Sequence, residues 1–340
     1  MGLPGRLALC VDSRFILMHR VAVHFLRDPV TIFPGHMFQL PESSQQLPHL
    51  RLVLVAVSFE RCYTPLMPPR IVGIVNCTPD SFSDGVGRVD PDRLIEHAHR
   101  LIDEGADLLD IGGDSTRPGS SCPGIEEEWR RISPIISKLA KNISVSVDTH
   151  HSEVARRAID CGATFINDVS GQRSPEMLEV VACSDASYIF MCNPHGGAHL
   201  FGPGFPFDTA VPKISSWISE TVEMCLAAGI GTDRLIVDPG MGAFVSHDPR
   251  VSWLVAENLH QFPTTQGGIL LGCSRKGFLK LLGEMDVDTK DSLSTRIGAA
   301  AIQDIPSNVP TYLRVHNVAR QREALEAPQV TMPEWRTVPR

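Results

Sequence analysis

Residues 71–85, which read IVGIVNCTPDSFSDG, decide how the rest of the chain is interpreted. The first five residues are apolar and mostly β-branched, a composition typical of a strand that is buried on both faces of a parallel sheet. From Asn76 onward the residues are polar, with Pro and Gly among them. α/β proteins place functional groups in loops of this kind, at the carboxyl end of a strand. One such loop has an ordinary structural explanation, so the interpretation depends on whether the pattern recurs.

The pattern does recur, as alternating strands and helices along residues 71–327. Apolar runs predict strands at 71–76, 108–112, 143–148, 163–168, 187–192, 234–238, 268–273 and 311–316. Helical patterns follow them at 91–104, 125–140, 151–161, 174–183, 212–229, 249–261, 292–303 and 318–327. Gly105, Gly162 and Gly229 stand at helix ends, where Gly commonly forms the C-cap. The α/β fold predicted is a (β/α)8 TIM barrel with an N-terminal extension. A doubly wound sheet is the alternative, but the chain lacks its G-x-G-x-x-G turn.

Two segments lie outside the predicted barrel. Residues 1–70 mix short apolar runs with spacers rich in Pro, Ser and Gln, and they form an extension to which the sequence assigns no role. Residues 328–340 form a C-terminal tail. The domain organisation predicted is therefore an extension at 1–70, a barrel at 71–327 and a tail at 328–340.

Composition excludes several classes of protein. The chain has 340 residues and a net charge of −8, which argues against a nucleic-acid binder. No apolar run approaches the about 18 residues of a membrane span, so no membrane association is expected. The nine Cys are scattered, without a C-x-x-C pair or a Cys/His spacing that suggests zinc. These features predict reduced thiols and a cytoplasmic enzyme.

In a TIM barrel the active site is built from the carboxyl ends of the strands. Every predicted strand end in this chain carries polar residues, whereas a purely structural barrel needs only a few, mostly as helix N-caps. The candidate residues at these ends are Asn76, Asp80, Asp84, Asp110, residues 112–119, Asp148, Asn167, Asp168, Met191, Asn193, Asp238, residues 272–277, Arg314, His316 and Asn317.

Three of these residues suit a planar heterocycle. Asp148, Asn167 and Asp238 lie at the third, fourth and sixth strand ends, so they are expected to face one cavity. Two carboxylates and an amide match the N–H and C=O edge of such a ring, because Asp accepts hydrogen bonds and Asn both donates and accepts. An alternative for Asp148 is a helix N-cap.

The seventh and eighth strand ends suit an anion. Lys276 and Arg275 follow the seventh strand, and Arg314 and His316 flank Val315 at the eighth, so these two point to one side. TIM barrels often hold phosphate at these ends, and Arg and His suit it as donors; a solvated charged face is the alternative. Loops at the first and second ends are long enough to close over a ligand. No strained nucleophile stands out, which indicates a transfer reaction that depends on positioning and leaving-group stabilisation.

The order of the polar blocks along the barrel resembles one known family. The blocks resemble those of dihydropteroate synthase, the pterin-binding barrel of folate biosynthesis, and they span the whole predicted barrel. The matching blocks are residues 76–85, 105–107, 114–119, 146–149, 166–168, 238–240, 274–276 and 314–316.

The resemblance implies a reaction and residue roles. Pyrophosphate would leave dihydropterin pyrophosphate, and the amine of p-aminobenzoate would attack the exposed methylene, giving dihydropteroate. The resemblance also implies a homodimer with small-molecule substrates and Mg²⁺ as the cofactor. The implied catalytic residues are Lys276, Arg314, His316 and Asp148. The implied binding residues for the pterin are Asp148, Asn167, Asp238 and Lys276. Those for pyrophosphate are Asn76, Arg314 and His316, with Mg²⁺ near Asn76, and those for p-aminobenzoate are Phe82, Thr116, Arg117 and Pro118. Met191 and Gly272 are further substrate-binding residues.

The chain departs from the family pattern at four places. Asp114 stands where the family usually has Glu, and Cys192-Asn193 replaces the usual His-Met. Ala243 displaces by one residue the aromatic expected beside p-aminobenzoate, which leaves Phe244 next in the chain, and Gly277 replaces the Ser beside Lys276. The predicted consequence is normal pterin binding with altered sulfonamide sensitivity. Two alternatives are a methyltetrahydrofolate-dependent methyltransferase barrel and a non-catalytic pterin-binding relative.

Overall fold

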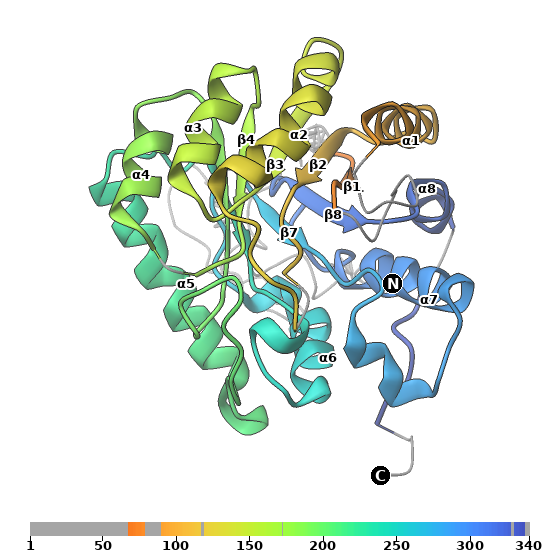
Figure 1. The fold of residues 1–340 in the computed structure, drawn as a ribbon. Helices are drawn as coiled ribbons and strands as arrows, with labels where there is room; N and C mark the ends of the chain where they lie inside the picture. Colours follow the sequence, from red (N-terminus) through yellow and green to blue (C-terminus); the bar gives the residue numbers. More distant parts are fainter. Residues whose placement is uncertain (1–66, 79–89, 117–118, 172, 328–329, 337–340) are drawn as a thin grey trace, which may run out of the picture. The chain divides into compact units, whose positions relative to one another are not determined.

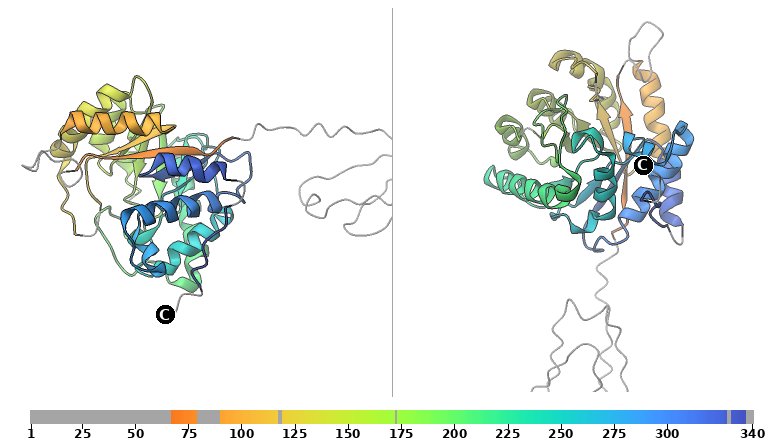
Figure 2. Two further views of the ribbon diagram at one scale, coloured as in Figure 1. Left: turned by 90° about the vertical axis from the view of Figure 1, so that its right-hand side faces the viewer. Right: turned by 90° about the horizontal axis from the view of Figure 1, so that it is seen from below.

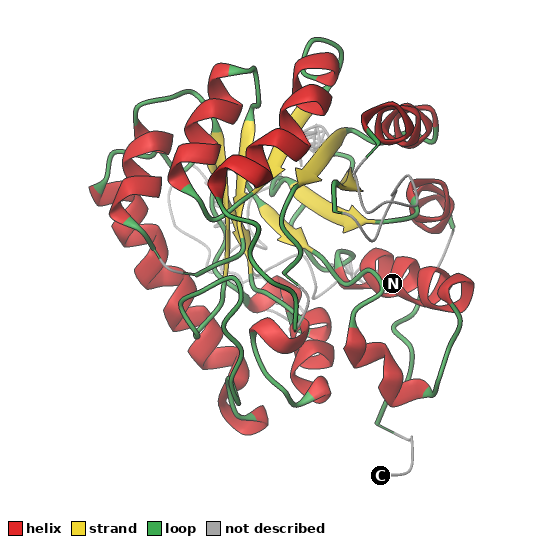
Figure 3. Cartoon of the chain, viewed as in Figure 1, coloured by secondary structure: helices red, strands yellow, loops and turns green. Residues whose placement is uncertain are grey.

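The eight strands form a closed parallel barrel, as predicted. The computed structural model describes residues 67–78, 90–116, 119–171, 173–327 and 330–336. The strands pair in sequence order, and β1 closes the barrel against β8. The helices surround the strands (Figure 1), as two further views confirm (Figure 2), and the strands occupy the centre (Figure 3). The strands are β1 (Arg70–Asn76), β2 (Leu108–Gly112), β3 (Ser144–Asp148), β4 (Phe165–Asp168), β5 (Ser187–Met191), β6 (Leu235–Asp238), β7 (Ile269–Leu271) and β8 (Thr311–Val315).

A helix follows each strand, and short 3-10 turns occur in the later loops. The α-helices are α1 (Pro91–Asp103), α2 (Ile125–Leu139), α3 (Ser152–Asp160), α4 (Pro175–Ala182), α5 (Ala210–Ala227), α6 (Pro249–Glu257), α7 (Val287–Ala301) and α8 (Val318–Glu326). The 3-10 turns are η3 (Phe207–Thr209), η4 (Gly242–Phe244), η5 (Leu259–Gln261) and η6 (Gly277–Leu282).

Two helices differ from their predicted bounds by more than two residues. Helix α7 begins five residues before the predicted start, because the Asp286 side chain accepts a hydrogen bond from the Thr289 N–H at 2.8 Å and caps a polar first turn. Helix α6 ends at Glu257, and the rest of the predicted helix is the separate turn η5. The glycines expected at helix ends, Gly105, Gly162 and Gly229, all have positive φ.

The side chains that point into the barrel form two layers: an apolar layer, and a polar layer two residues further along the strands. Seven residues form one buried apolar cluster inside the barrel: Val72, Leu108, Phe165, Ile189, Ile236, Leu270 and Tyr312. Because side chains of a strand repeat every two residues on one face, the next inward residue lies two positions further along. Those positions include Asp110, Asn167, Asp238 and Arg314. The apolar layer therefore forms the base on which the polar residues of the site stand.

The described part of the C-terminal tail packs against α6. The indole N–H of Trp335 donates to Glu257 at 2.7 Å, and its ring stacks on Trp253 with centroids 6.1 Å apart. Arg336 also pairs with Glu257. No helix in the described ranges has the length and apolar character needed to span a membrane. The predicted extension at 1–70 falls almost wholly outside the described residues.

Candidate active site

A buried network of polar side chains joins four strands at the carboxyl end of the barrel. Arg314 donates from Nε to Asp110 at 2.5 Å and from Nη2 to Asp148 at 2.8 Å. The Asn167 amide donates to Asp110 at 3.0 Å, and the Ser146 hydroxyl donates to the other Asp110 oxygen at 2.5 Å. Three of the residues predicted for the site therefore meet around Asp110, which the sequence placed among the candidates without a specific role.

The network settles the position of Asp148. The N-cap residue of α3 is His151, and the Asp148 carboxylate pairs with Arg314 inside the barrel, so the N-cap alternative is wrong. Burial raises the pKa of Asp148 to about 7; Arg314 opposes this rise, and the Asp110 carboxylate adds to it. The carboxyl group can therefore change between hydrogen-bond donor and acceptor near neutral pH.

Asn167 has a free acceptor in the same place. Its side chain is buried, and its Oδ1 atom has no hydrogen-bond partner among the residues that the structure describes. A buried polar atom without a partner is unfavourable by about 1–3 kcal/mol. A bound ring with an N–H at this point would remove that penalty.

Asp238 and Lys276 form the other side of the site. Asp238 accepts from the Gly240 N–H at 2.8 Å, and Lys276 Nζ donates to the Met241 carbonyl at 3.2 Å. Burial raises the pKa of Asp238 and lowers that of Lys276, and in each case the opposite charge of the partner resists the shift. Arg314 also acts on both groups. Arg314 therefore couples this pair electrostatically to the Asp110 network.

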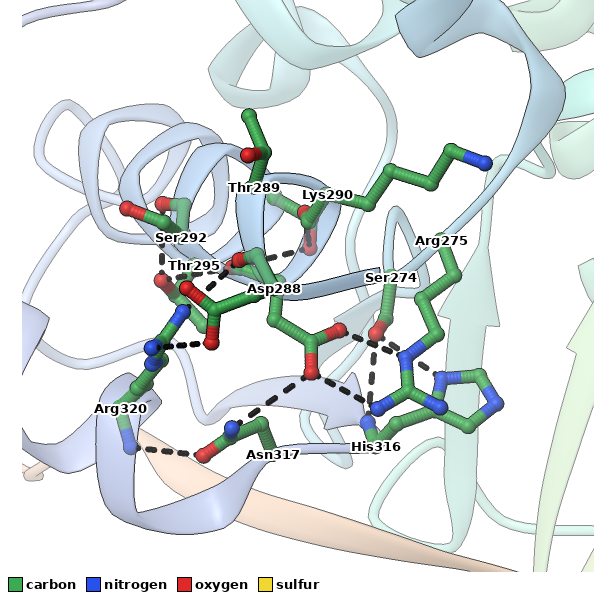
Figure 4. A network of polar contacts seen from close by, with 12 residues as sticks. Ser274, Arg275, Asp288, Thr289, Lys290, Ser292, Thr295, His316, Asn317 and Arg320 are labelled. Atoms are coloured by element: carbon green, nitrogen blue, oxygen red, sulfur yellow. Dashed lines mark hydrogen bonds and ion pairs between the residues drawn. The ribbon is translucent and has the colours of Figure 1, made fainter. Parts of the chain in front are cut away.

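His316 is held by the loop after β7. Its Nδ1 lies 3.0 Å from the Ser274 hydroxyl, which also accepts from the His316 N–H at 3.2 Å (Figure 4). The neighbouring Arg275 has a left-handed backbone, with φ of 58°, and binds Asp291 through two hydrogen bonds of 2.6 and 2.7 Å. Arg275 thus anchors this loop to α7, whereas Lys276 reaches the site.

Some of the remaining predicted site residues are described by the structure, and others are not. Met191 is buried in the wall with Val169, Ala198 and Phe244, and Gly272 lies beside the Arg314 side chain. Asn76 ends β1 opposite Gly112, and its side chain is half-buried. Thr116 is half-buried in the loop after β2. Phe82, Arg117 and Pro118 lie outside the described residues, so their predicted roles stay predictions.

The structure shows what replaces the usual family residues at Cys192, Asn193 and Ala243. Cys192 is fully buried, and burial raises its thiol pKa. The Asn193 amide donates to the carbonyls of Val169 and Gly197, both at 3.2 Å, and shapes the loop after β5. Phe244 lies under Lys276, with Nζ 5.3 Å from the ring centroid. An aromatic ring therefore remains beside Lys276 despite Ala243.

A further group of side chains was not recognised from the sequence. Asp114, Cys122, His151 and His199 lie close together in the loops after β2, β3 and β5, and Glu128 of α2 contacts His151. The adjacent pair His150-His151 after the third strand is the one sequence feature that could have indicated this group. Its other members belong to separate segments of the chain.

Comparisons with known proteins agree with this geometry. A family model described as pterin binding enzyme matches residues 72–316. The chain is 35% identical over 267 residues to dihydropteroate synthase type-3 of Escherichia coli, which covers 76% of this chain and 97% of that protein.

Solved structures give the same answer. Dihydropteroate synthase of Xanthomonas albilineans with 4-aminobenzoic acid has a TM-score of 0.67 at 36% identity, over 76% of this chain and 92% of that chain. The enzyme from the same organism in complex with 7,8-dihydropteroate has a TM-score of 0.64 at 34% identity, over the same shares. The chain therefore belongs to the dihydropteroate synthase family of pterin-binding enzymes.

Proposed function

We propose that this chain is a transferase that condenses 6-hydroxymethyl-7,8-dihydropterin pyrophosphate with p-aminobenzoate, giving 7,8-dihydropteroate and pyrophosphate. One observation carries the proposal: Asp148 and Asn167, which can accept hydrogen bonds from a heterocycle, share one buried network with Arg314, a cation that suits a diphosphate. The relatives with bound 4-aminobenzoic acid and 7,8-dihydropteroate support it.

The pterin ring would occupy the deeper half of the site. Asp148, Asn167 and Asp238 offer acceptors to its N–H groups, and Asn167 has an acceptor atom without a partner among the described residues. Lys276 would donate to a ring carbonyl or nitrogen from the opposite side. Met191 would provide an apolar wall for the ring. Gly272, which has no side chain, would let the ring lie close to the backbone.

The diphosphate would bind toward β8 and β1. Arg314 uses two of its N–H groups on carboxylates within the described part of the chain, and a guanidinium has about five, so donors remain for phosphate oxygens. His316 and Asn76 would contribute from either side. Arg314 thereby connects the pterin half to the diphosphate half.

The donor chemistry at Asn76 suits Mg²⁺. This ion prefers oxygen ligands and commonly binds through one or two protein oxygens together with substrate phosphates and water. The Asn76 amide oxygen at the end of β1 can supply one such ligand. When bound, the ion would neutralise charge on the pyrophosphate leaving group.

The p-aminobenzoate ring would bind above the pterin, between the loops after β1 and β2. We assign this role to Thr116 together with Phe82, Arg117 and Pro118, all from the predicted closing loops. Phe244, beside Lys276, offers an aromatic surface on the opposite side.

The residues promote the reaction by charge stabilisation. The C–O bond between the methylene and pyrophosphate breaks, and its electron pair leaves with pyrophosphate; the amine nitrogen of p-aminobenzoate then forms the C–N bond and loses a proton. Arg314 and His316 stabilise the departing negative charge. Asp148 and Asp238 stabilise the positive charge that spreads into the pterin ring. Homodimerisation and a cytoplasmic location remain predictions of the sequence.

The test is the incorporation of labelled p-aminobenzoate into dihydropteroate, with and without Mg²⁺. We expect incorporation that requires Mg²⁺ and is abolished in Lys276→Ala and Arg314→Ala. Lys280→Ala is the matched control, because Lys280 is an exposed lysine in the same loop region, on η6. Pterin binding without incorporation would contradict the proposal, and methyl transfer from methyltetrahydrofolate to a corrinoid would indicate the methyltransferase alternative.

A further inference from the structure

Five side chains with metal-ligating atoms gather at the rim of the barrel, beside the site already described. This rim cluster comprises Asp114 and Cys122 from the loop after β2, His150 and His151 after β3, and His199 after β5. The ligand atoms of Cys122, His150 and His151 all lie within 4.8 Å of one another, and so do those of Asp114, Cys122 and His199. Cys122 belongs to both groups, so the two sets adjoin at this residue.

His151 is oriented as metal-bound histidines are. Its Nδ1 lies 2.7 Å from the Glu128 carboxylate, whose side chain is fully buried in α2. The opposite ring nitrogen, Nε2, then faces the Cys122 sulfur at 4.0 Å. A histidine that ligates a metal usually donates its other N–H to a carboxylate or carbonyl, which fixes the ring and its tautomer. Glu128 fits that supporting role.

Asp114 and His199 close the other side of the cluster. The Asp114 carboxylate lies 2.6 Å from His199 Nε2 and 3.8 Å from His150 Nδ1. The Asp114 side chain is only 2% exposed. Its Oδ1 atom and His199 Nδ1 are buried and have no hydrogen-bond partner among the residues that the structure describes. Both groups therefore have a buried atom without a described partner that can act as a metal ligand.

We propose that the rim cluster binds a divalent transition-metal ion of the Zn²⁺ type. Cys122, His150 and His151 would supply three ligands, and the Asp114–His199 pair would supply the fourth. A thiolate with imidazoles selects Zn²⁺ over Mg²⁺, which prefers oxygen ligands. In a tetrahedral zinc site with bonds of about 2.0–2.3 Å the ligand atoms lie about 3.5 Å apart. The ligand atoms within each group lie within 4.8 Å of one another, so side-chain movements would have to bring them closer on binding. Cys122 is exposed, so the ion has a path of entry.

The ion would fasten the loop that carries Thr116. Asp114 and Cys122 stand at the two ends of residues 115–121, and His150, His151 and His199 belong to neighbouring loops. Binding would therefore restrain both ends of this segment against the loops after β3 and β5. The inference goes beyond the proposed function, because metal binding is measured without either substrate.

The test is calorimetric titration of Zn²⁺ into the metal-free full-length protein, in the presence of excess Mg²⁺. We expect one Zn²⁺ per chain, unaffected by Mg²⁺, with affinity at least tenfold weaker in Cys122→Ser and His150→Ala. Co²⁺ in place of Zn²⁺ should give the absorption of a tetrahedral thiolate complex, which Cys122→Ser removes. The matched controls are Cys183→Ser and His99→Ala, since these residues are exposed and lie on other parts of the barrel.

A further variant tests the supporting role of Glu128. Loss of such a partner typically weakens metal binding by about 10–100-fold, so Glu128→Gln should weaken Zn²⁺ binding by that factor. Near-ultraviolet circular dichroism of each metal-free variant shows whether it folds. The proposal is overturned if the wild-type protein does not bind Zn²⁺, or if Cys122→Ser and His150→Ala bind it as the controls do.

Discussion

The floor of the site and its rim are built in different ways. The floor consists of strand residues, and its bonds join positions as far as 204 residues apart, as between Arg314 and Asp110. The rim consists of loop residues, among them Asp114, Cys122 and His199. These side chains can ligate a metal ion, whereas those of the floor are suited to hydrogen bonds with a heterocycle. Strand positions are fixed by the pairing of the barrel, whereas loops can change residues without disturbing it. The strand network therefore fixes the base of the site, whereas the loops supply Lys276 and His316 and also carry the positions at which the chain departs from the family pattern.

Arg314 should give the largest effect, because it joins both halves of the floor. Arg314→Ala leaves Asp110 and Asp148 buried without their cation, and breaking a buried ion pair in this way is unfavourable by about 3–5 kcal/mol. We expect the free energy of unfolding, measured in urea, to fall by that amount, together with loss of turnover. Arg320→Ala, which breaks a surface pair with Asp288, should change it by less than about 1 kcal/mol. Equal effects of the two variants would contradict a distinct floor.

Lys276 should separate catalysis from stability. Burial lowers the pKa of Lys276, so its charge is held in the site at an energetic penalty. Lys276→Met should lower kcat/KM by about 10²-fold or more, by analogy with the loss of one buried charge-stabilising donor, while the free energy of unfolding should fall by less than in Arg314→Ala, because the Lys276 amine bonds a carbonyl and not a carboxylate. Steady-state kinetics and urea unfolding of the same preparation check this. A variant that loses stability but keeps its activity would assign Lys276 to the fold instead.

Asp148 should make pterin binding depend on pH. Its pKa of about 7 means that the acceptor form is scarce at pH 6 and dominant at pH 8. Because the carboxylate must lose its proton before it accepts from the ring, affinity for the dihydropterin should be about tenfold higher at pH 8 than at pH 6. Calorimetric titration at both values measures this. Asp148→Asn should bind more weakly and lose most of the dependence; a variant that keeps the full dependence would exclude Asp148 as its source.

Gly277 should give the smallest effect, because it lies at the start of η6, outside the buried network. A Cβ added at this position meets nothing within 4 Å among the described residues, so Gly277→Ser should leave the free energy of unfolding within about 0.5 kcal/mol of wild type. One added hydrogen bond is worth about 0.5–1.5 kcal/mol, so KM for p-aminobenzoate should fall about 2–10-fold. Sulfonamide inhibition should shift with it. A wild-type inhibition constant equal to that of a typical family enzyme would contradict the predicted altered sensitivity.

The barrel could be predicted from the sequence because several independent patterns indicated the same strands and helices. Apolar strand runs, helical periodicity and Gly at helix ends all indicated the same eight units. The start of α7 was missed because its first turn is polar, and only the cap made by Asp286 marks it. Long-range partners could not be predicted: the central position of Asp110 follows from contacts 36 to 204 residues away.

The rim cluster shows a second limit of sequence reasoning. A search for local Cys/His spacing found no zinc motif, because Cys122, His151 and His199 come from three separate loops. Only closure of the barrel brings these loops together. By contrast, Asp148, Asn167 and Asp238 were found because each follows a strand whose end could be located from its own apolar run.

The central claim is that the pterin half and the diphosphate half belong to one site. The most direct measurement is competition calorimetry with 6-hydroxymethylpterin pyrophosphate against 6-hydroxymethylpterin and against inorganic pyrophosphate with Mg²⁺. We expect one equivalent of the linked ligand to displace both smaller ligands. Asp238→Asn should weaken binding of the pterin part, and His316→Ala should weaken binding of the pyrophosphate part. Displacement of only one of them, with the other still bound, would place the two halves in separate cavities and contradict the account.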